Sequence, residues 1–208
     1  IKHFEEIFED SKKYEKYLQN SDIFINSSTP SFNLPIMNLS LKYNTNYADL
    51  ASDIYKDEII STLKFDQQIL ENEFKYQNLF ALINLGISPG ITNFLIGEKI
   101  HSLKNLPYEV KIKKLEINLL EEIQSKKLIF SWSPKVAIDE LAFPPVFYKK
   151  NRPKTIEPFS KSKVYKFPYF RNFVDIYPVF QEELISLKQS FPQIENLASW
   201  IVTGRREK

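Results

Sequence analysis

The sequence predicts an α/β fold in its first part and an α+β arrangement in the rest. Up to residue 86, short apolar runs of strand type alternate with segments of helical periodicity, and the connections between them are short. After residue 86, short β-rich runs predominate and few helical patterns separate them. Alternating strands and helices are typical of a parallel sheet covered on both faces, whereas successive strands indicate a mixed or antiparallel sheet. We therefore predict two domains, over residues 1–86 and 87–208.

In the first domain, the order strand, helix, strand, helix, strand is that of the second half of a Rossmann-like sheet. The chain starts with Ile1 rather than Met, so we expect it to lack its N-terminal part. Only four glycines are present, and none forms a G-x-G-x-x-G pattern, so a pyrophosphate loop is expected upstream. The expected strands are 22–27, 47–50 and 80–85, and the expected helices are 34–43 and 58–75, after an acidic helix-forming stretch over 4–18.

The junction of the two domains is the most informative segment. An apolar run breaks at Gly86, turns through Ser88, Pro89 and Gly90, and restarts as a helix at Thr92. Parallel sheets place ligands at the carboxyl ends of their strands, and glycines let the main chain approach a bound group. The alternative is that these residues make an ordinary buried turn.

The second domain is expected to hold a mixed or antiparallel sheet. Ser133 and Pro134 predict a helix start, with Ser133 as the N-cap residue. Asp139 and Glu140 are adjacent on that helix, so we expect two solvated carboxylates rather than an acid/base pair. The expected strands are 110–116, 128–132, 146–148, 154–156, 163–167, 173–179 and 199–202, and the expected helices are 135–142 and 182–189.

Composition excludes several classes of function. The 208 residues carry a net charge of +2, so no broad field directs the chain to nucleic acid or membranes, and we expect neither partner. The basic cluster 161–166 is expected to be a solvated face. The absence of cysteine excludes thiolate chemistry and fits a cytoplasmic protein. The two histidines, His3 and His101, have no metal-ligand spacing, so no metal is expected, and no apolar run reaches the roughly 18 residues of a membrane span.

Five motifs in this order resemble the saccharopine dehydrogenase family, particularly its reductase branch. They are residues 22–30, 33–37, 46–51, 86–93 and 130–133. The resemblance covers roughly residues 7–159 and is loose over the last fifty or so. It departs from the family at Ser88, where Asp is usual, and at Asn46, where His is common. The first departure puts saccharopine itself in doubt as the substrate.

The resemblance implies an NAD- or NADP-binding Rossmann domain over 1–86 and a substrate and dimerisation domain over 87–208, incomplete or divergent at its end. It implies a homodimer acting on a small amino-acid or polyamine-type substrate. Asp49 and Ser88 are the catalytic candidates. The implied cofactor-binding residues are Ser27, Ser28, Thr29, Pro30, Asp49, Ala51, Gly86, Ser88, Pro89 and Gly90, and the implied substrate-binding residues are Asn93, Ser131 and Trp132.

Because cysteine, a metal cluster and a His-paired nucleophile are all missing from the sequence, a cofactor would have to supply the chemistry. The expected reaction is hydride transfer at the C–N bond of an amino-acid-derived imine or secondary amine, and the chain alone is expected to be inactive. Two alternatives stay open: a carboxynorspermidine dehydrogenase-like polyamine enzyme, and a non-catalytic Rossmann-like interaction or sensor module. Trp132 also has two interpretations, as the wall of a pocket or as core packing.

Overall fold

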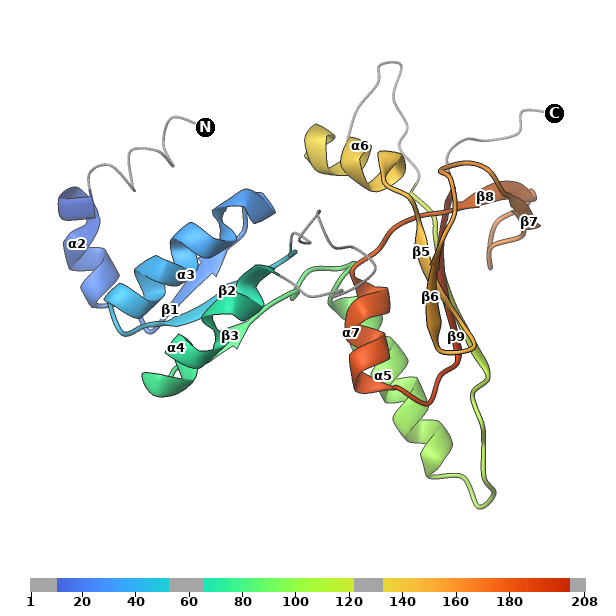
Figure 1. Ribbon diagram of the computed structural model, residues 1–208, viewed down its shortest axis with the longest axis horizontal. Helices are drawn as coiled ribbons and strands as arrows, with labels where there is room; N and C mark the ends of the chain where they lie inside the picture. Colours follow the sequence, from blue (N-terminus) through green and yellow to red (C-terminus); the bar gives the residue numbers. More distant parts are fainter. Residues whose placement is uncertain (1–10, 53–65, 122–132, 203–208) are drawn as a thin grey trace. The chain divides into compact units, whose positions relative to one another are not determined.

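The computed structural model describes residues 11–52, 66–121 and 133–202 (Figure 1). Contacts divide them into two units, the first made of residues 11–52 and 66–87 and the second of residues 88–121 and 133–202. The expected strand 128–132 and the first part of the expected helix 58–75 lie outside the described residues. The candidates Ser131 and Trp132 lie outside them too.

The first unit contains a three-stranded parallel sheet in the order β1-β2-β3, which confirms the predicted sheet type. Met37, Tyr47 and Phe74 form its buried core, which joins β2 to the two helices that pack on it. The elements are α2 (Ser11–Gln19), β1 (Ile23–Asn26), the 3-10 turn η1 (Pro30–Phe32), α3 (Asn33–Lys42), β2 (Asn46–Asp49), the 3-10 turn η3 (Asp66–Leu70), α4 (Glu71–Tyr76) and β3 (Ala81–Leu82).

Two expectations for this unit need correction. The described part of the helix expected over 58–75 is divided into η3 and α4. The strand expected over 80–85 is shorter, because only Ala81 and Leu82 pair with β2 and Asn84 takes a left-handed conformation at φ 64°. Left-handed backbone does not continue a strand, and Asn is one of the few residues that adopts it at low cost.

The second unit contains a mixed six-stranded sheet, as predicted. β4 pairs with β9 in parallel, and the other pairings are antiparallel. The elements are α5 (Ile91–Lys104), β4 (Lys114–Leu119), α6 (Pro134–Ala142), β5 (Val146–Lys149), β6 (Arg152–Thr155), β7 (Lys163–Tyr165), β8 (Val174–Pro178), α7 (Glu183–Ser190) and β9 (Asn196–Val202).

β9 is the central strand of this sheet. Leu197 pairs with both Leu115 of β4 and Tyr148 of β5, and Ile201 pairs with Leu119 of β4 and Tyr177 of β8. A strand residue has one neighbour on each side, so β4 runs along one side of β9 while β5 and β8 follow one another along the other. The strand expected over 110–116 is therefore displaced to Lys114–Leu119, where it matches the register of β9.

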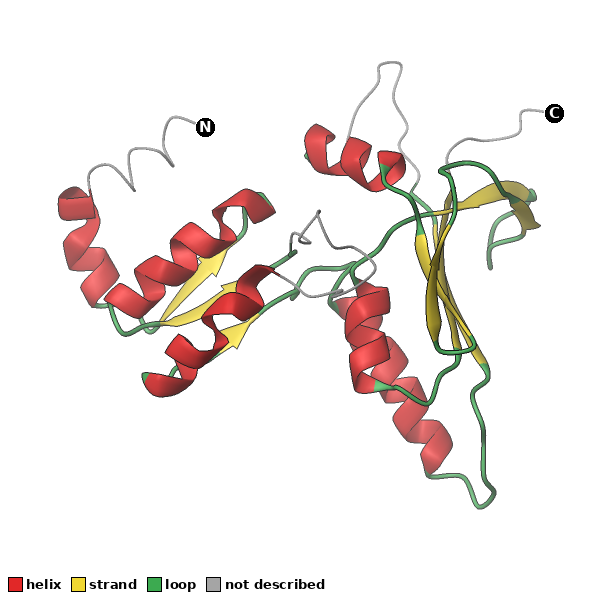
Figure 2. Ribbon diagram, viewed as in Figure 1, coloured by secondary structure: helices red, strands yellow, loops and turns green. Residues whose placement is uncertain are grey.

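Helices α5 and α7 lie side by side on one face of this sheet (Figure 2). Ile100 of α5 and Leu184 and Leu187 of α7 share one buried cluster with Ile117, Tyr148 and Leu197 of the strands. Each of these side chains is less than 9% exposed, so the cluster is the core of the unit. A second cluster, around Phe167, Val174 and Ile176, packs against Trp200.

Candidate functional site

In the first unit, the loop that follows β1 is folded around the side chain of Asn26. The Asn26 carbonyl oxygen accepts hydrogen bonds from the backbone N–H and the hydroxyl of Ser28, at 3.0 and 2.7 Å. Its amide donates to the Thr29 carbonyl at 3.3 Å and to Asn33 Oδ1 at 2.7 Å. Ser27 stays exposed, Ser28 and Thr29 are half-buried, and Pro30 is buried. The predicted loop thus has a fixed shape and an exposed hydroxyl at its start.

Asn33 ties this loop to the end of β2. Its Oδ1 also accepts the Tyr47 hydroxyl at 3.0 Å, and its amide donates to the carbonyl of Ala51 at 2.9 Å. Both Asn33 and Tyr47 are completely buried. Burial, together with the nearby charge of Asp49, raises the pKa of the Tyr47 phenol, so the hydroxyl stays a donor. Sequence reasoning missed both residues, although a buried polar group of this kind must be hydrogen-bonded.

Asp49, a predicted catalytic and cofactor residue, is a fully buried carboxylate at the end of β2. It accepts the backbone N–H of Asn84 at 2.8 Å and Gln67 Nε2 at 3.0 Å. Its pKa is raised by burial, which the hydrogen bonds from Asn84 and Gln67 oppose. The visible role of the Asp49 side chain is to hold the segment that leads from β3 to Gly86, while its contact with a cofactor stays a prediction.

The first unit therefore brings residues 27–30, Asp49, Ala51 and Gly86 to the carboxyl ends of adjacent parallel strands, as the sequence predicts. Asn84 Oδ1 is buried there and has no hydrogen-bond partner among the described residues. A buried acceptor without a donor is costly, so Asn84 is a strained point at the end of β3.

In the second unit, the residues that follow Gly86 build the start of α5. Gly90 is the N-cap residue and has φ 130°, a conformation open to glycine. Its backbone N–H donates to Asn93 Oδ1 at 3.4 Å. Pro89 is buried, and the Ser88–Pro89 peptide bond is cis. The predicted turn and helix start are present at the expected residues, whereas the strand before them ends earlier, at Leu82.

Three side chains at this helix start are tied to α7. Glu183, which is completely buried, accepts hydrogen bonds on Oε1 from the hydroxyls of Ser88 and Thr92, the latter at 3.1 Å. The amide of Asn93 donates to the hydroxyl of Ser186 at 2.7 Å. Two predicted site residues, Ser88 and Asn93, thus already have partners inside the protein.

Sequence reasoning missed that the charge of Glu183 acts on Glu140. Burial raises the pKa of Glu183, although the bonds from Ser88 and Thr92 oppose the shift, and its Oε2 has no hydrogen-bond partner among the described residues. Burial and the charge of Glu183 raise the pKa of Glu140 to about 7, while a hydrogen bond with Gln181 acts to lower it. The expectation that Glu140 is merely solvated is therefore wrong.

The neighbouring Asp139, to which the same expectation applies, lies in different surroundings from Glu140. Asp139 pairs with exposed Lys135 at 2.6 Å, one helical turn earlier. Adjacent helical residues do not face one another, and the pKa of Glu140 is raised by the charge of Glu183. The sequence does not single out Glu183, because Gln181 and Glu182 precede it directly in the same segment.

The residues that the structure describes contain no group of three or more His, Cys, Asp or Glu side chains arranged to hold a metal ion. Within the same ranges, no helix combines the length and the apolar character needed to cross a membrane.

No protein-family model and no curated protein matches the sequence. The fold is similar to that of apo saccharopine dehydrogenase (L-Glu forming) from Saccharomyces cerevisiae, with a TM-score of 0.69 and 18% identity over 94% of this chain. A protein from Bacteroides fragilis, provisionally described as an oxidoreductase, is 11% identical over 93% of this chain and 51% of its own, with a TM-score of 0.38.

The similarity to the yeast structure concerns the fold. This chain spans 43% of the length of the yeast protein, less than half. The two units of the present chain, a parallel sheet followed by a mixed sheet with helices on one face, are thus a known combination.

Proposed function

We propose that this chain is part of an NAD(P)-dependent oxidoreductase of the saccharopine dehydrogenase type, which transfers hydride at the C–N bond of an amino-acid-derived imine or secondary amine. The observation that carries the proposal is the fold similarity to saccharopine dehydrogenase over 94% of the chain. The five sequence motifs in family order support it independently. A homodimer and an amino-acid-type substrate belong to the same proposal.

The carboxyl ends of β1, β2 and β3 fit one part of a dinucleotide. Ser27 offers an exposed hydroxyl, and Gly86 has no side chain to obstruct a ligand. We expect these residues, with the backbone of residues 27–30, to hold the cofactor, which when bound supplies the hydride. Asp49 would act through Asn84 by keeping the end of β3 in place.

A titration with NADH and with NADPH tests this proposal. It should be done on protein made from the full reading frame that contains this chain, because this sequence has no G-x-G-x-x-G of its own. We expect saturable fluorescence enhancement with micromolar affinity for one of the two. Ser27→Trp should abolish it, because the exposed loop residue would then fill the space a ligand needs, whereas Ser102→Trp on α5, also exposed, should not.

A folded full-length protein that binds neither nucleotide would overturn the proposal and favour the second candidate, a non-catalytic interaction or sensor module. One observation already favours that candidate. The side chains of Ser88, Thr92 and Asn93 are all bonded to α7, so at this helix start they support the fold.

A further inference from the structure

The six-stranded sheet has a second face, opposite α5 and α7, on which several cations lie beside the apolar cluster of Val174, Ile176 and Trp200. Side chains of a strand alternate between its faces, and Ile117, Tyr148 and Leu197 face the helices because they share a cluster with them. Their strand neighbours therefore lie on the opposite side, and cross-strand partners share a face. We call this side the cationic face. It is defined by Lys114 and Glu116 of β4, Lys149 of β5, Arg152 and Lys154 of β6, and Trp200 of β9.

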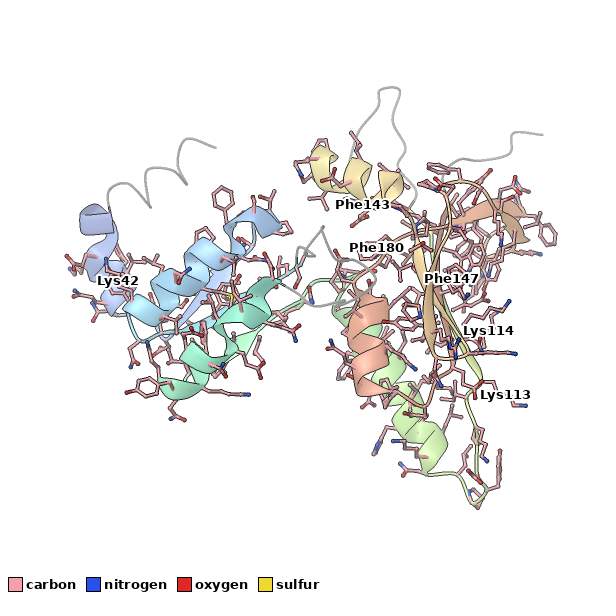
Figure 3. The ribbon with its side chains drawn as sticks, in the orientation of Figure 1. Lys42, Lys113, Lys114, Phe143, Phe147 and Phe180 are labelled. Carbon is pink, nitrogen blue, oxygen red and sulfur yellow. The ribbon has the colours of Figure 1, made fainter. Side chains whose placement is uncertain are left out.

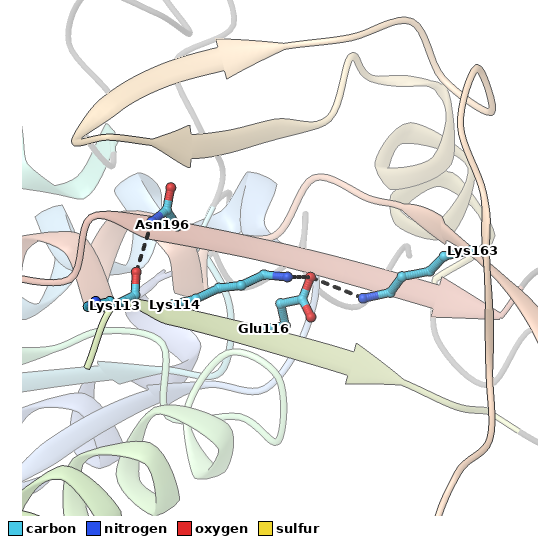
Figure 4. A network of polar contacts seen from close by, with 5 residues as sticks. All are labelled: Lys113, Lys114, Glu116, Lys163 and Asn196. Carbon is cyan, nitrogen blue, oxygen red and sulfur yellow. Dashed lines mark hydrogen bonds and ion pairs between the residues drawn. The ribbon is translucent and has the colours of Figure 1, made fainter. Parts of the chain in front are cut away.

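The carboxylate on this face is already neutralised. Glu116 Oε1 lies 2.9 Å from Lys114 Nζ and 3.1 Å from Lys163 Nζ (Figure 4). Burial alone would raise the pKa of Glu116, but the bonds from these two lysines lower it, so the carboxylate stays charged and occupied. Lys163 also places its ammonium 4.1 Å from the centre of the Trp200 ring. Figure 3 labels Lys114 and Phe147, which mark two strands of this face.

Three other cations on the face have no such compensation. Lys149, Arg152 and Lys154 are exposed, and none forms an ion pair with any residue that the structure describes. Lys149 and Arg152 are direct cross-strand partners, an arrangement that destabilises a hairpin through like-charge repulsion. Charge is concentrated around this hairpin, since residues 149–173 hold eight Lys or Arg and one acidic residue, whereas the whole chain carries a net charge of +2.

Protection of a sheet edge explains only part of this pattern. Charged residues on edge strands discourage unwanted strand pairing, and Arg152 and Lys154 lie on β6, which pairs only with β5 among the described strands. Lys149, however, belongs to β5, which pairs with β6 on one side and with β9 on the other. Edge protection does not require a cation there.

We propose that the cationic face binds an acidic segment of another protein. Carboxylates suit this surface, because Arg152 can hold one through two parallel bonds while Lys149 and Lys154 add charge on either side. No large apolar side chain of β4, β5, β6 or β9 is exposed, so these strands offer no membrane anchor; the exposed Phe159, Tyr169 and Phe173 lie on other segments. The Trp200 ring is covered by Lys163 and so offers no free surface for stacking, which single-stranded nucleic acids use.

Fluorescence anisotropy with an end-labelled oligoglutamate peptide tests this proposal on the chain as it stands. We expect binding that weakens as salt rises, and a loss of affinity of about tenfold or more in K149E/R152E/K154E. The matched control is K16E/K42E/K99E, which changes net charge equally at exposed lysines of α2, α3 and α5. This control should bind within about twofold of the unchanged chain. Circular dichroism should confirm that both variants fold.

Several results would overturn the proposal. Equal loss in the two triple variants would mean that net charge alone attracts the peptide. Tighter binding of a single-stranded oligonucleotide or of vesicles rich in phosphatidylserine, again lost in K149E/R152E/K154E, would assign the face to a different partner. Self-association that sedimentation shows to disappear in the same variant would make the partner a second copy of this chain. Absence of peptide binding at low salt would remove the proposal altogether.

Discussion

The carboxyl group of Glu183 accepts a hydrogen bond from the Ser88 hydroxyl, although 95 positions separate the two residues in the sequence. The same oxygen accepts the Thr92 hydroxyl, so the first residue of α7 holds both the turn before α5 and the first turn of that helix. Because Glu183 is fully buried, no water replaces a donor that is removed. The contact is therefore a long-range restraint on the Ser88–Gly90 turn.

Ser88→Ala should lower the free energy of unfolding by about 1–3 kcal/mol, because it removes one of the two donors to a buried carboxyl. Urea denaturation measures the change. The matched control is Ser102→Ala on α5, where the exposed hydroxyl bonds to the Lys99 carbonyl, and it should stay within about 0.5 kcal/mol of the unchanged protein. Equal stability of the two variants would show that the Ser88 contact contributes nothing to the fold.

Two glycines of the α5 region should respond to alanine in opposite directions. Gly90, at φ 130°, occupies a conformation that an L side chain strains, so Gly90→Ala should cost about 1–3 kcal/mol. Gly97 lies inside α5, and an added Cβ would meet Phe191 Cζ at 4.0 Å, an ordinary contact. Gly97→Ala should therefore stabilise the protein by up to about 1 kcal/mol. Thermal unfolding of both variants checks the prediction, and a shift of the same sign in both would contradict it.

Asp49→Asn should destabilise the first unit by about 1–3 kcal/mol. The substitution replaces one carboxylate oxygen by an NH2 group, which would then face the N–H group of Asn84 or of Gln67 instead of accepting a hydrogen bond from it. The matched control is Asp22→Asn, an exposed position just before β1 that should change stability by less than about 0.5 kcal/mol. Urea denaturation again provides the measurement. A neutral Asp49→Asn would mean that the buried carboxylate does not hold the end of β3.

The fold class and most elements follow from local pattern. The strands at Ile23–Asn26 and Asn46–Asp49 and the helix that starts at Pro134 appear where apolar period and turn residues predict them. The position of β4 is not predicted correctly. The alternation of apolar residues at Val110 and Ile112 predicts a strand there, whereas pairing with β9 starts only at Lys114. The register of two strands about 80 residues apart is a long-range property that local sequence does not contain.

The candidate site, too, could be predicted from the sequence only in part. Residues 27–30, Asp49 and Gly86 follow successive parallel strands, which is enough to predict that they lie at one end of the sheet. The partners of Ser88 and Asn93 could not be predicted, because Glu183 and Ser186 lie more than 90 positions later in the chain. Similarly, the adjacency of Asp139 and Glu140 argues against an acid/base pair between them, yet it gives no information about Glu183, whose charge acts on Glu140 from 43 positions later in the chain.

Glu140 should make stability depend on pH. Its pKa rises from the ordinary 4.5 to about 7 in the folded protein, through burial and then the charge of Glu183, with Glu121 acting in the same direction and Gln181 against it. The folded state therefore binds more protons than the unfolded state between these values. The resulting stability is complete below about pH 4.5 and is lost as pH rises to about 7. We expect a loss on the order of 1–2 kcal/mol across this window, since Glu140 is only partly buried.

Glu140→Gln should remove the contribution of this residue, because a neutral amide does not ionise. The measurement is the difference in unfolding free energy between the unchanged protein and the variant, followed by urea denaturation from pH 4.5 to 7. We expect that difference to move steadily in favour of the variant as pH rises. Glu73→Gln, at an exposed position on α4, should show no such trend. If the Glu140→Gln difference were as flat as that of Glu73→Gln, Glu140 would be an ordinary solvated carboxylate and the charge of Glu183 would have no energetic consequence for it.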